Sequence, residues 1–341
     1  MGIKNTVFQS VIVIAILAVI YVIYLLNKGG EYMNIAGFAQ GTTYHITYKS
    51  RKGEDLQSEI EALLKNIDAS LSIYNNESVI SRFNRNDNNV KADKAFTEVF
   101  KKSHEVFLNT GGAFDITVGP IVNALGFGNS DTLIVNQTLI DSLLPYIGMQ
   151  KVRLADGILV KDNPNIVLDV NAIAQGYTVD VVAAYLEAGK IRNYMVEIGG
   201  EVRAKGKNAQ KLYWRIGIDK PEEGNLLPGA DLQAIIELKN RSLATSGNYR
   251  KFYERNGVKY VHTIDPHTGQ PVISSLLSAT VIAKDCMTAD AYATALMVFG
   301  LDKSVEFLKK NSFLEAYLVY ADDKGSFQVY STPGLQDMLT E

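Results

Sequence analysis

The pattern of apolar and polar positions divides the chain into an apolar N-terminal run and a longer body. Residues 7–26 are almost wholly apolar, with Gln9 and Ser10 as the strongly polar interruptions. This length meets the roughly 20 residues that a helix needs to cross a bilayer. The run ends in bulky side chains, which favours an uncleaved anchor over the alternative of a cleavable signal peptide. We expect an anchor and linker in residues 1–30 and one body in residues 31–341.

Periodicity within the body predicts both helices and strands. Apolar positions at helical spacing predict helices over residues 55–70, 95–109, 172–188, 289–299 and 303–310, with glycines closing several of them. Loosely alternating residues 35–48 predict strand material around Gly41. Further strands are expected over residues 166–170, 194–198, 213–218, 233–238, 260–264, 276–283 and, as the last, 315–320. Because strands dominate the later half and helices are clustered, we expect an α+β fold.

Composition narrows the function classes. The net charge of -3 argues against a broad basic surface, and therefore against nucleic acid as a partner. The single cysteine, Cys286, excludes an internal disulfide and a cysteine-based zinc site. A lone cysteine among apolar neighbours is more typical of a buried small side chain than of a nucleophile.

A carboxylate and a hydroxyl recur on one face of the helix expected over residues 289–299. Asp290 and Thr294 are four residues apart, so their side chains share a face, and their neighbours are small. Both are hard oxygen donors, which suit Mg²⁺ bound to phosphate. The alternative is a helix capped by Thr288, with Thr294 bonding back to its own turn.

The segment 169–177 combines an acidic residue with the start of a helix. Asp169 lies near the end of an expected strand, and helix starts offer unpaired N–H groups to anions. The turn can also direct a carbonyl toward a metal, although Asp169 could instead be a helix cap. Gly176 lies inside the expected helix, where glycine is costly unless another group packs closely against it.

Three polar loops have the composition of ligand-binding turns. Residues 110–120 and 199–201 are glycine-rich and acidic, which suits close approach to a ligand, although each could also be an ordinary turn. The third, residues 265–271, follows a strand that carries His262. A histidine there can take a proton from an attacking hydroxyl near neutral pH, and a structural histidine is the alternative.

Taken together, these segments resemble the ApbE family of FAD:protein FMN transferases. The resemblance runs from about residue 37 to residue 300. Its motifs follow the family's order at residues 41–42, 72–74, 78–84, 112–120, 126–128, 169–180, 199–201, 245–249, 262–271 and 289–294. The resemblance implies a two-lobed α+β body, related to the T-fold, with mixed or antiparallel sheets and flanking helices.

The resemblance also implies an FAD-binding cleft with Mg²⁺ on the pyrophosphate. The family's metal-binding positions match Ala172, through its backbone carbonyl, Asp290 and Thr294. Tyr74 matches an aromatic residue that packs on the flavin, and His262 matches a residue proposed to assist the attacking hydroxyl. The other FAD-contacting positions match Gln40, Ala113, Phe114, Asp115, Asp169, Gln175 and Ile264.

Two positions depart from the family pattern. Gln175 replaces a lysine that many relatives carry, so we expect weaker binding of phosphate with activity retained. Leu125 replaces the usual tryptophan before Gly-Phe-Gly, which puts one aromatic contact in doubt.

The expected function is Mg²⁺-dependent transfer of FMN from FAD to a threonine or serine hydroxyl, with release of AMP. In the family, acceptors are subunits of membrane redox complexes. With the apolar run, this implies a body on the periplasmic side of a bacterial inner membrane. An FAD pyrophosphatase and a non-catalytic flavin-binding protein are the alternatives.

Overall fold

The computed structural model describes residues 30–126, 137–222, 229–248, 252–255, 258–261 and 263–340. The expected anchor, Phe127, Tyr249 and His262 lie outside these ranges. Across the described ranges, we find no helix with the length and apolar character needed to span a membrane.

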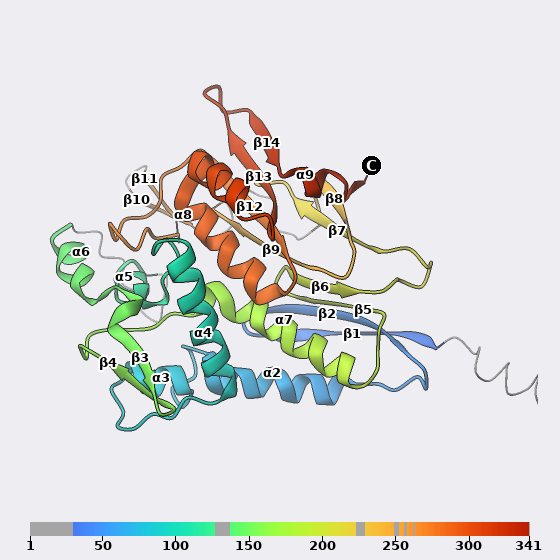
Figure 1. The fold of residues 1–341 in the computed structure, drawn as a ribbon, viewed down its shortest axis with the longest axis horizontal. Coiled ribbons are helices and arrows are strands. Elements are labelled where there is room, and N and C mark those ends of the chain that lie inside the picture. The colour runs from blue at the N-terminus through green and yellow to red at the C-terminus, as the bar shows by residue number, and fades with distance from the viewer. Residues whose placement is uncertain are drawn as a thin grey trace, which may run out of the picture.

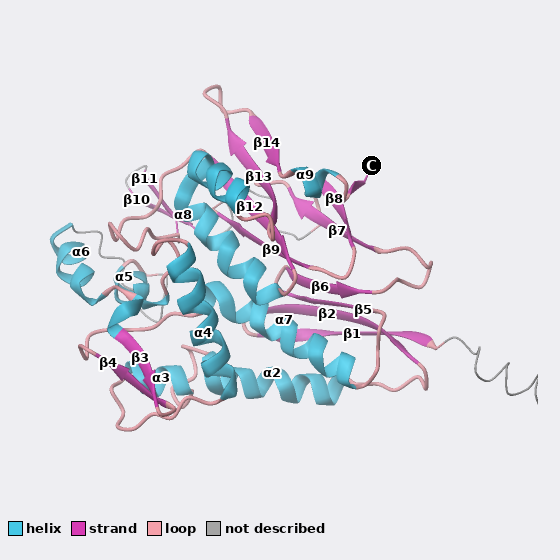
Figure 2. Cartoon of the chain, in the orientation of Figure 1, coloured by secondary structure: helices cyan, strands magenta, loops and turns pink. Residues whose placement is uncertain are grey.

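An eight-stranded antiparallel sheet forms the centre of the molecule (Figures 1 and 2). Its strand order is β1-β2-β5-β6-β9-β12-β13-β14, and every neighbouring pair is antiparallel. The strands are β1 (Glu31–Ala39), β2 (Thr42–Ser50), β5 (Tyr194–Ile198), β6 (Glu201–Lys205), β9 (Ser242–Gly247), β12 (Leu276–Ala283), β13 (Glu315–Ala321) and β14 (Phe327–Ser331).

Helices cover one face of this sheet and a smaller sheet packs on the other. The covering helices are α2 (Gln57–Leu71), α4 (Lys94–Asn109), α7 (Asn171–Ala188) and α8 (Cys286–Lys310) (Figure 1). Ala244 and Val281 pack on the helix side, whereas their neighbours Leu243 and Ile282 pack on the other side, as strand alternation requires. The smaller sheet contains β7 (Trp214–Asp219), β8 (Leu232–Leu238) and β15 (Leu339–Thr340).

The remaining elements are short and lie mostly around the end of α4. They are α3 (Val79–Asn84), η1 (Ile116–Val118), α5 (Gly119–Ala124), α6 (Gln137–Leu143), η2 (Leu144–Tyr146), η3 (Met149–Lys151), β3 (Val152–Ala155), β4 (Ile158–Lys161), β10 (Phe252–Arg255), β11 (Val258–Val261) and α9 (Pro333–Gln336).

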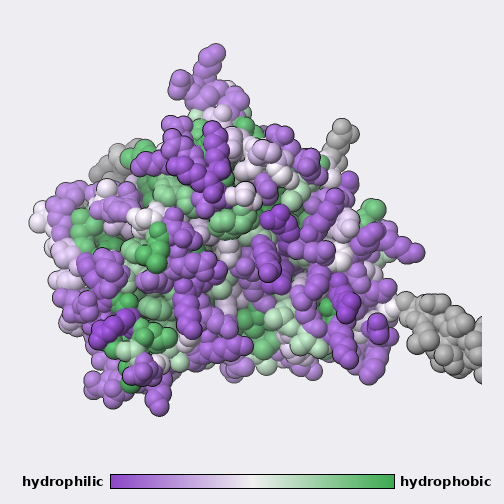
Figure 3. All heavy atoms as spheres, in the orientation of Figure 1, coloured by the Kyte–Doolittle hydropathy of each residue, from purple (hydrophilic) through white to green (hydrophobic). Residues whose placement is uncertain are grey.

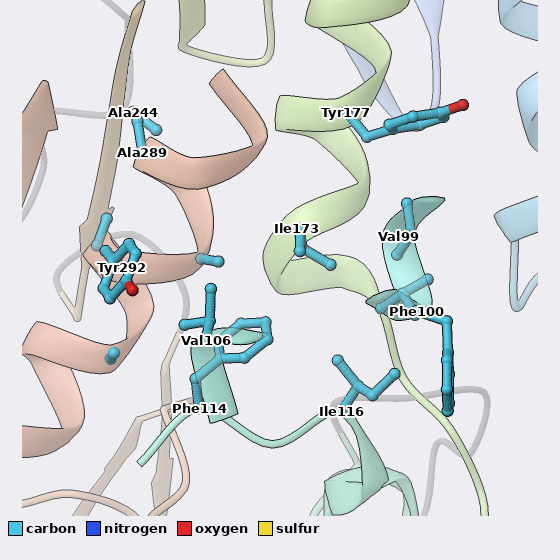
Figure 4. Packing of buried hydrophobic residues seen from close by; sticks show 14 of the residues in the cluster. Val99, Phe100, Val106, Phe114, Ile116, Ile173, Tyr177, Ala244, Ala289 and Tyr292 are labelled. Carbon is cyan, nitrogen blue, oxygen red and sulfur yellow. The ribbon is translucent and has the colours of Figure 1, made fainter. Parts of the chain in front are cut away.

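The main core joins α4, α7 and α8. Ile173 and Tyr177 of α7 belong to one apolar cluster with Val106 of α4 and Ala289 of α8 (Figure 4). The surface seen in the orientation of Figure 1 is largely hydrophilic, with scattered apolar groups (Figure 3). The N-terminal end of α7 is thus fixed between two helices and the sheet.

The α+β prediction is confirmed, and so are most of the expected elements. Helices α2, α4 and α7 and strands β5, β8 and β12 lie within two residues of the expected bounds. The first expected strand is a hairpin, in which Gln40 and Gly41 form a two-residue turn with φ of 54° and 73°. The division into two lobes and the relation to the T-fold stay predictions.

Two expectations were wrong, and a third is confirmed. Residues 166–170 form no strand, because the Asn84 side chain takes the place of a neighbouring strand, donating to the Leu168 carbonyl at 2.9 Å and accepting from its amide at 2.8 Å. The helix break expected at Gly300 is confirmed, because α8, which starts at Cys286, consists of two helices that meet at Gly300, where φ is 70° and ψ is -176°. Residues 315–320 are not the last strand, because β14 and β15 follow.

Candidate active site

Gly176 brings α7 against α8 at the centre of the candidate site. A Cβ atom at this position would lie 2.6 Å from the Cys286 carbonyl oxygen and 2.8 Å from Cβ of Asp290. Since real Cβ atoms do not approach so closely, glycine is required for the two helices to pack. Its amide donates a hydrogen bond to Oδ2 of Asp290 at 3.0 Å. The helix-interior glycine therefore sets the position of the Asp290 carboxylate.

The Gly176 amide that donates to Asp290 also lies next to the Ala172 carbonyl of the same helix. In an α-helix, the amide of residue i+4 lies about 3 Å from the carbonyl oxygen of residue i, and Gly176 is four residues after Ala172 in α7. The Ala172 carbonyl and Oδ2 of Asp290 therefore converge on one amide. Two oxygen atoms of the expected metal set lie side by side where α7 begins.

Thr294 lies one turn after Asp290 on α8 and contacts the sheet. Its Oγ1 is 3.1 Å from Oγ of Ser246 on β9. The alternative reading of this segment is wrong in both parts, because α8 is capped by Asp285, which accepts from the Thr288 amide at 2.9 Å, and Thr294 bonds across to the sheet. Sequence reasoning missed Ser246 as a partner, although it placed the residue in the motif 245–249.

The environment of Asp290 disfavours its charge. The side chain is only 6% exposed, and burial together with the nearby charge of Asp180 raises its pKa to about 7, against the opposing effect of the Gly176 amide. No ion pair of Asp290 with a described lysine, arginine or histidine offsets this cost. A carboxylate in such surroundings is suited to a cation.

Asp180 of α7 links this helix to the start of α8 and to β6. It lies one turn after Gly176 and accepts from the amides of Cys286 and Met287, at 3.0 and 2.9 Å. It therefore caps α8 from a neighbouring helix. Arg203 of β6 donates to its Oδ1 at 2.6 Å, yet burial still raises the pKa of Asp180. Its spacing from Gly176 in the motif 169–180 was the signal that sequence reasoning did not use.

Tyr74 and Asp169 meet beside the first turn of α7. The Tyr74 side chain is 68% exposed, and its hydroxyl lies near the Asn171 side chain. Burial of the hydroxyl, followed by the charge of Asp169, raises the pKa of Tyr74. Asp169 accepts from the Asn171 amide at 2.8 Å, and so participates in starting α7 as the capping alternative expected, although Val170 is the N-cap.

Gln40 and Gln175 lie at the same end of α7 as Tyr74. The Gln175 side chain packs against Gly199, where an added Cβ would lie 2.4 Å from its Nε2 atom. The Gly199 amide donates to the Thr43 carbonyl at 3.1 Å, which joins this loop to the hairpin whose turn holds Gln40. The Gln40 side chain lies near that of Asp68, close to the end of α2, and its Oε1 atom is buried without a hydrogen-bond partner among the described residues.

The Asp115 carboxylate accepts hydrogen bonds from backbone groups of the protein. It is 6% exposed, and its two oxygens accept from the amides of Thr117 and Met149 at 2.8 and 3.1 Å. Ala113 and Phe114 beside it are also buried. The side chains of the motif 112–120 therefore shape a wall of the site.

Ile264 belongs to a separate apolar cluster that also contains Leu125. Leu125 is fully buried there, so the residue that replaces the family's tryptophan serves this cluster. His267 joins the two loops, with Nδ1 3.1 Å from Oδ1 of Asp265 and Nε2 3.0 Å from the Gly111 carbonyl. The loop that follows His262 is thereby held against the motif 112–120.

A cavity of about 220 Å³ adjoins Asp169. It is lined by Ile73, Asn76, Ser81, Asn84, Arg85, Gly119, Asn123, Val167, Leu168 and Asp169, so it opens beside the loop that carries Tyr74. A second cavity of about 250 Å³ is lined by Glu187, Ile191, Arg192 and Lys205, near the other end of α7. It contains none of the expected site residues.

A cation at this site would depend on oxygen atoms other than those of carboxylates. In the described part of the chain, no group of three or more histidine, cysteine, aspartate and glutamate side chains is placed to hold an ion. A cation near Asp290 would therefore be bound by the Thr294 hydroxyl and the Ala172 carbonyl as well. Such a mixed oxygen set suits Mg²⁺, which usually takes one or two carboxylates and completes its shell with phosphate and water.

Comparison with known proteins shows the family of this chain. Residues 40–318 match the model of the ApbE family. The chain is 37% identical to the FAD:protein FMN transferase of Vibrio cholerae, covering 92% of this chain and 95% of the relative. It is 38% identical to the FAD:protein FMN transferase of Haemophilus influenzae, covering 88% and 89%.

Solved structures show the same fold. The flavin transferase ApbE from Vibrio cholerae superposes with a TM-score of 0.81 at 36% identity, covering 91% of this chain and 100% of that one. The apo flavinyl transferase ApbE from Pseudomonas stutzeri gives a TM-score of 0.81 at 32% identity, covering 91% and 97%. The chain therefore belongs to the ApbE family. Its activity is FAD:protein FMN transfer, that is, protein flavinylation.

Proposed function

We propose that this chain uses Mg²⁺ to transfer the FMN part of FAD to a threonine or serine hydroxyl of another protein, with release of AMP. The convergence of the Asp290 carboxylate and the Ala172 carbonyl on the Gly176 amide supports the metal part of this proposal. Asp290, Thr294 and Ala172 would hold the ion. When bound, Mg²⁺ neutralises charge on the pyrophosphate and on the leaving AMP.

The residues around the start of α7 would bind and orient FAD. The exposed Tyr74 ring, whose hydroxyl lies near Asn171 at the helix start, can stack on the flavin. The first turn of α7 offers backbone amides to the pyrophosphate. Gln175 can donate a hydrogen bond there but supplies no positive charge, so phosphate binding depends on the amides and the metal.

The acceptor hydroxyl must lose a proton as it attacks. Its oxygen forms a bond to the FMN-side phosphorus while the bond from that phosphorus to the AMP oxygen breaks. His262 is proposed to take the proton, on the basis of the motif 262–271. Asp265 and His267, which hold the following turn against Gly111, would keep this part of the chain in place.

Full-length protein, FAD, Mg²⁺ and a candidate acceptor with an exposed threonine test the proposal. A fluorescent flavin band on the denatured acceptor is expected, and EDTA should abolish it. Asp290→Asn should remove the band, whereas Asp302→Asn, an exposed carboxylate change on the same helix, should not. Free FMN without labelled acceptor would indicate the pyrophosphatase, and unchanged FAD would indicate a binding protein. Labelling that persists in EDTA would refute the metal site.

We also propose that residues 7–26 anchor the chain in a bacterial inner membrane, with the body on the periplasmic side. The length and apolar character of that run support this placement. An enzyme held there would meet acceptors that are subunits of membrane redox complexes. Protease added to intact spheroplasts should digest the body, and protection from the protease would contradict the proposed orientation.

A further inference from the structure

Ser246 faces α8 from the central sheet. Ala244, two residues earlier on β9, packs in one cluster with Ala289 of α8, and Figure 4 shows the two side chains together. Since residues two apart on a strand share a face, Ser246 also points to the helix side. Thr245 lies on the opposite face, with Oγ1 2.8 Å from Oγ1 of Thr280.

The Thr294 hydroxyl makes a contact that is unusual for a helical threonine. Thr178 shows the usual arrangement, since its Oγ1 donates to the Ala174 carbonyl one turn back at 2.7 Å. Thr294 instead lies 3.1 Å from Oγ of Ser246, in another element. The hydroxyl is thus held toward the sheet rather than toward its own helix.

A hydroxyl that binds a cation offers its lone pairs to the ion and keeps one proton. That proton must point away from the cation and needs an acceptor. Either hydroxyl of the pair can donate, so Ser246 Oγ, 3.1 Å from Thr294 Oγ1, can serve as that acceptor. We infer that Ser246 is a positioning residue, which accepts the Thr294 proton and thereby directs the Thr294 lone pairs toward the cation. This inference rests on the proposed metal site.

When the Ser246 hydroxyl is removed, the Thr294 hydroxyl can donate to a different acceptor. Its proton would turn to the Asp290 carbonyl one turn back, as Thr178 does with Ala174, and its lone pairs would turn with it. Changes in groups that orient a metal ligand typically weaken metal affinity about 10–100-fold. Because Thr294 is one of several oxygen ligands, we expect about a 10-fold loss for Ser246→Ala.

Binding of Mn²⁺ tests the inference without turnover. The full chain in detergent is titrated with Mn²⁺ in the presence of ADP, which has a diphosphate but no flavin, and free Mn²⁺ is measured by electron paramagnetic resonance. Ser246→Ala should weaken binding about 10-fold. Ser246→Thr, which keeps a hydroxyl, should restore most of the affinity. Thr245→Val, which removes the hydroxyl on the opposite face of the same strand, should leave affinity unchanged.

A double-mutant cycle checks the route of the effect. If Ser246 acts through Thr294, Ser246→Ala should cause no further loss in a Thr294→Val background. An additional 10-fold loss there, or wild-type affinity in Ser246→Ala alone, would overturn the inference. Asp290→Ala separates this failure from that of the proposed function. Wild-type binding in Asp290→Ala would refute the metal site itself, whereas its loss beside an unaffected Ser246→Ala would refute the positioning role alone.

Discussion

The carboxylate of Asp180 accepts the backbone amide of Cys286, so that a residue of α7 caps the start of α8. The two helices are thereby fixed in register at the turn that precedes Asp290. Gly176, one turn earlier on α7, makes the next contact between the two helices. The position of Asp290 in the proposed metal site consequently depends on how these helices pack.

Asp180→Ala should destabilise the fold strongly. It leaves the half-buried guanidinium of Arg203 without this partner and leaves two α8 amides without their acceptor. We expect a loss of about 3 kcal/mol in the free energy of unfolding, measured in urea. Lys94→Ala, which breaks the exposed pair with Glu98, should cost less than about 0.5 kcal/mol. Equal effects of the two changes would show that the cap is unimportant.

Gly176→Ala should separate α7 from α8. Alanine is normally the better helix former by about 1 kcal/mol, but its Cβ would clash with the Cys286 carbonyl at 2.6 Å. We expect net destabilisation of about 2 kcal/mol and weaker binding of Mn²⁺. Gly189→Ala at the end of α7, where the nearest atom is 3.3 Å away, serves as the control. A stabilised Gly176→Ala variant would contradict the close packing.

Stability in EDTA should fall as the pH rises from about 4 to about 7. Burial raises the pKa of Asp290 to about 7, so the folded protein binds more protons than the unfolded chain in this window. The free energy of unfolding then decreases with pH, by at most about 1.4 kcal/mol per pH unit for one group. Asp290→Asn should flatten this slope in urea titrations. Part of the slope should remain, because burial also raises the pKa of Asp180.

Tyr74→Ala should weaken FAD binding. The ring is exposed beside the start of α7, and loss of a stacking partner costs about 1 kcal/mol, or roughly 5-fold in affinity. Flavin fluorescence quenching measures this change, and Tyr74→Phe should retain most of the affinity. Leu212→Ala, another exposed apolar position, should have no effect. Unchanged quenching in Tyr74→Ala would exclude stacking at this residue.

Gln175→Lys should tighten FAD binding and make it more sensitive to salt. The side chain lies at the start of α7 against Gly199, where a positive charge would face the pyrophosphate. We expect a gain of a few-fold at low ionic strength that is largely lost at high ionic strength. The dissociation constant measured at two salt concentrations checks this, with the exposed change Gln210→Lys as control. An equal gain in both variants would indicate general charge attraction.

The sequence predicted those elements whose signal is local. The helices carry apolar residues at regular spacing, and Gly189 ends α7 as expected. The strand expected over residues 166–170 failed because its partner is the side chain of Asn84, which no periodicity reveals. Gly300 ends the first part of α8 as expected, because its φ of 70° and ψ of -176° are not helical.

The site was predictable to the extent that its residues lie in motifs. Asp290 and Thr294 share a helix face, which their spacing alone indicates. Their partners Gly176 and Ser246 come from α7 and β9, so these pairings depend on tertiary packing. Asp180 was missed for the same reason, since its role as a cap for another helix appears only when the two helices meet.

The order of the elements along the chain has a consequence for synthesis. Gln40 lies in the first hairpin, whereas Asp290 and Thr294 lie on α8, close to the end of the chain. A nascent chain that stops before Cys286 has the Gly176 amide and the Asp180 carboxylate but none of their partners on α8. Truncated translation products therefore lack both side chains of the proposed metal set. If that set is required, transfer of FMN begins only after α8 has been made.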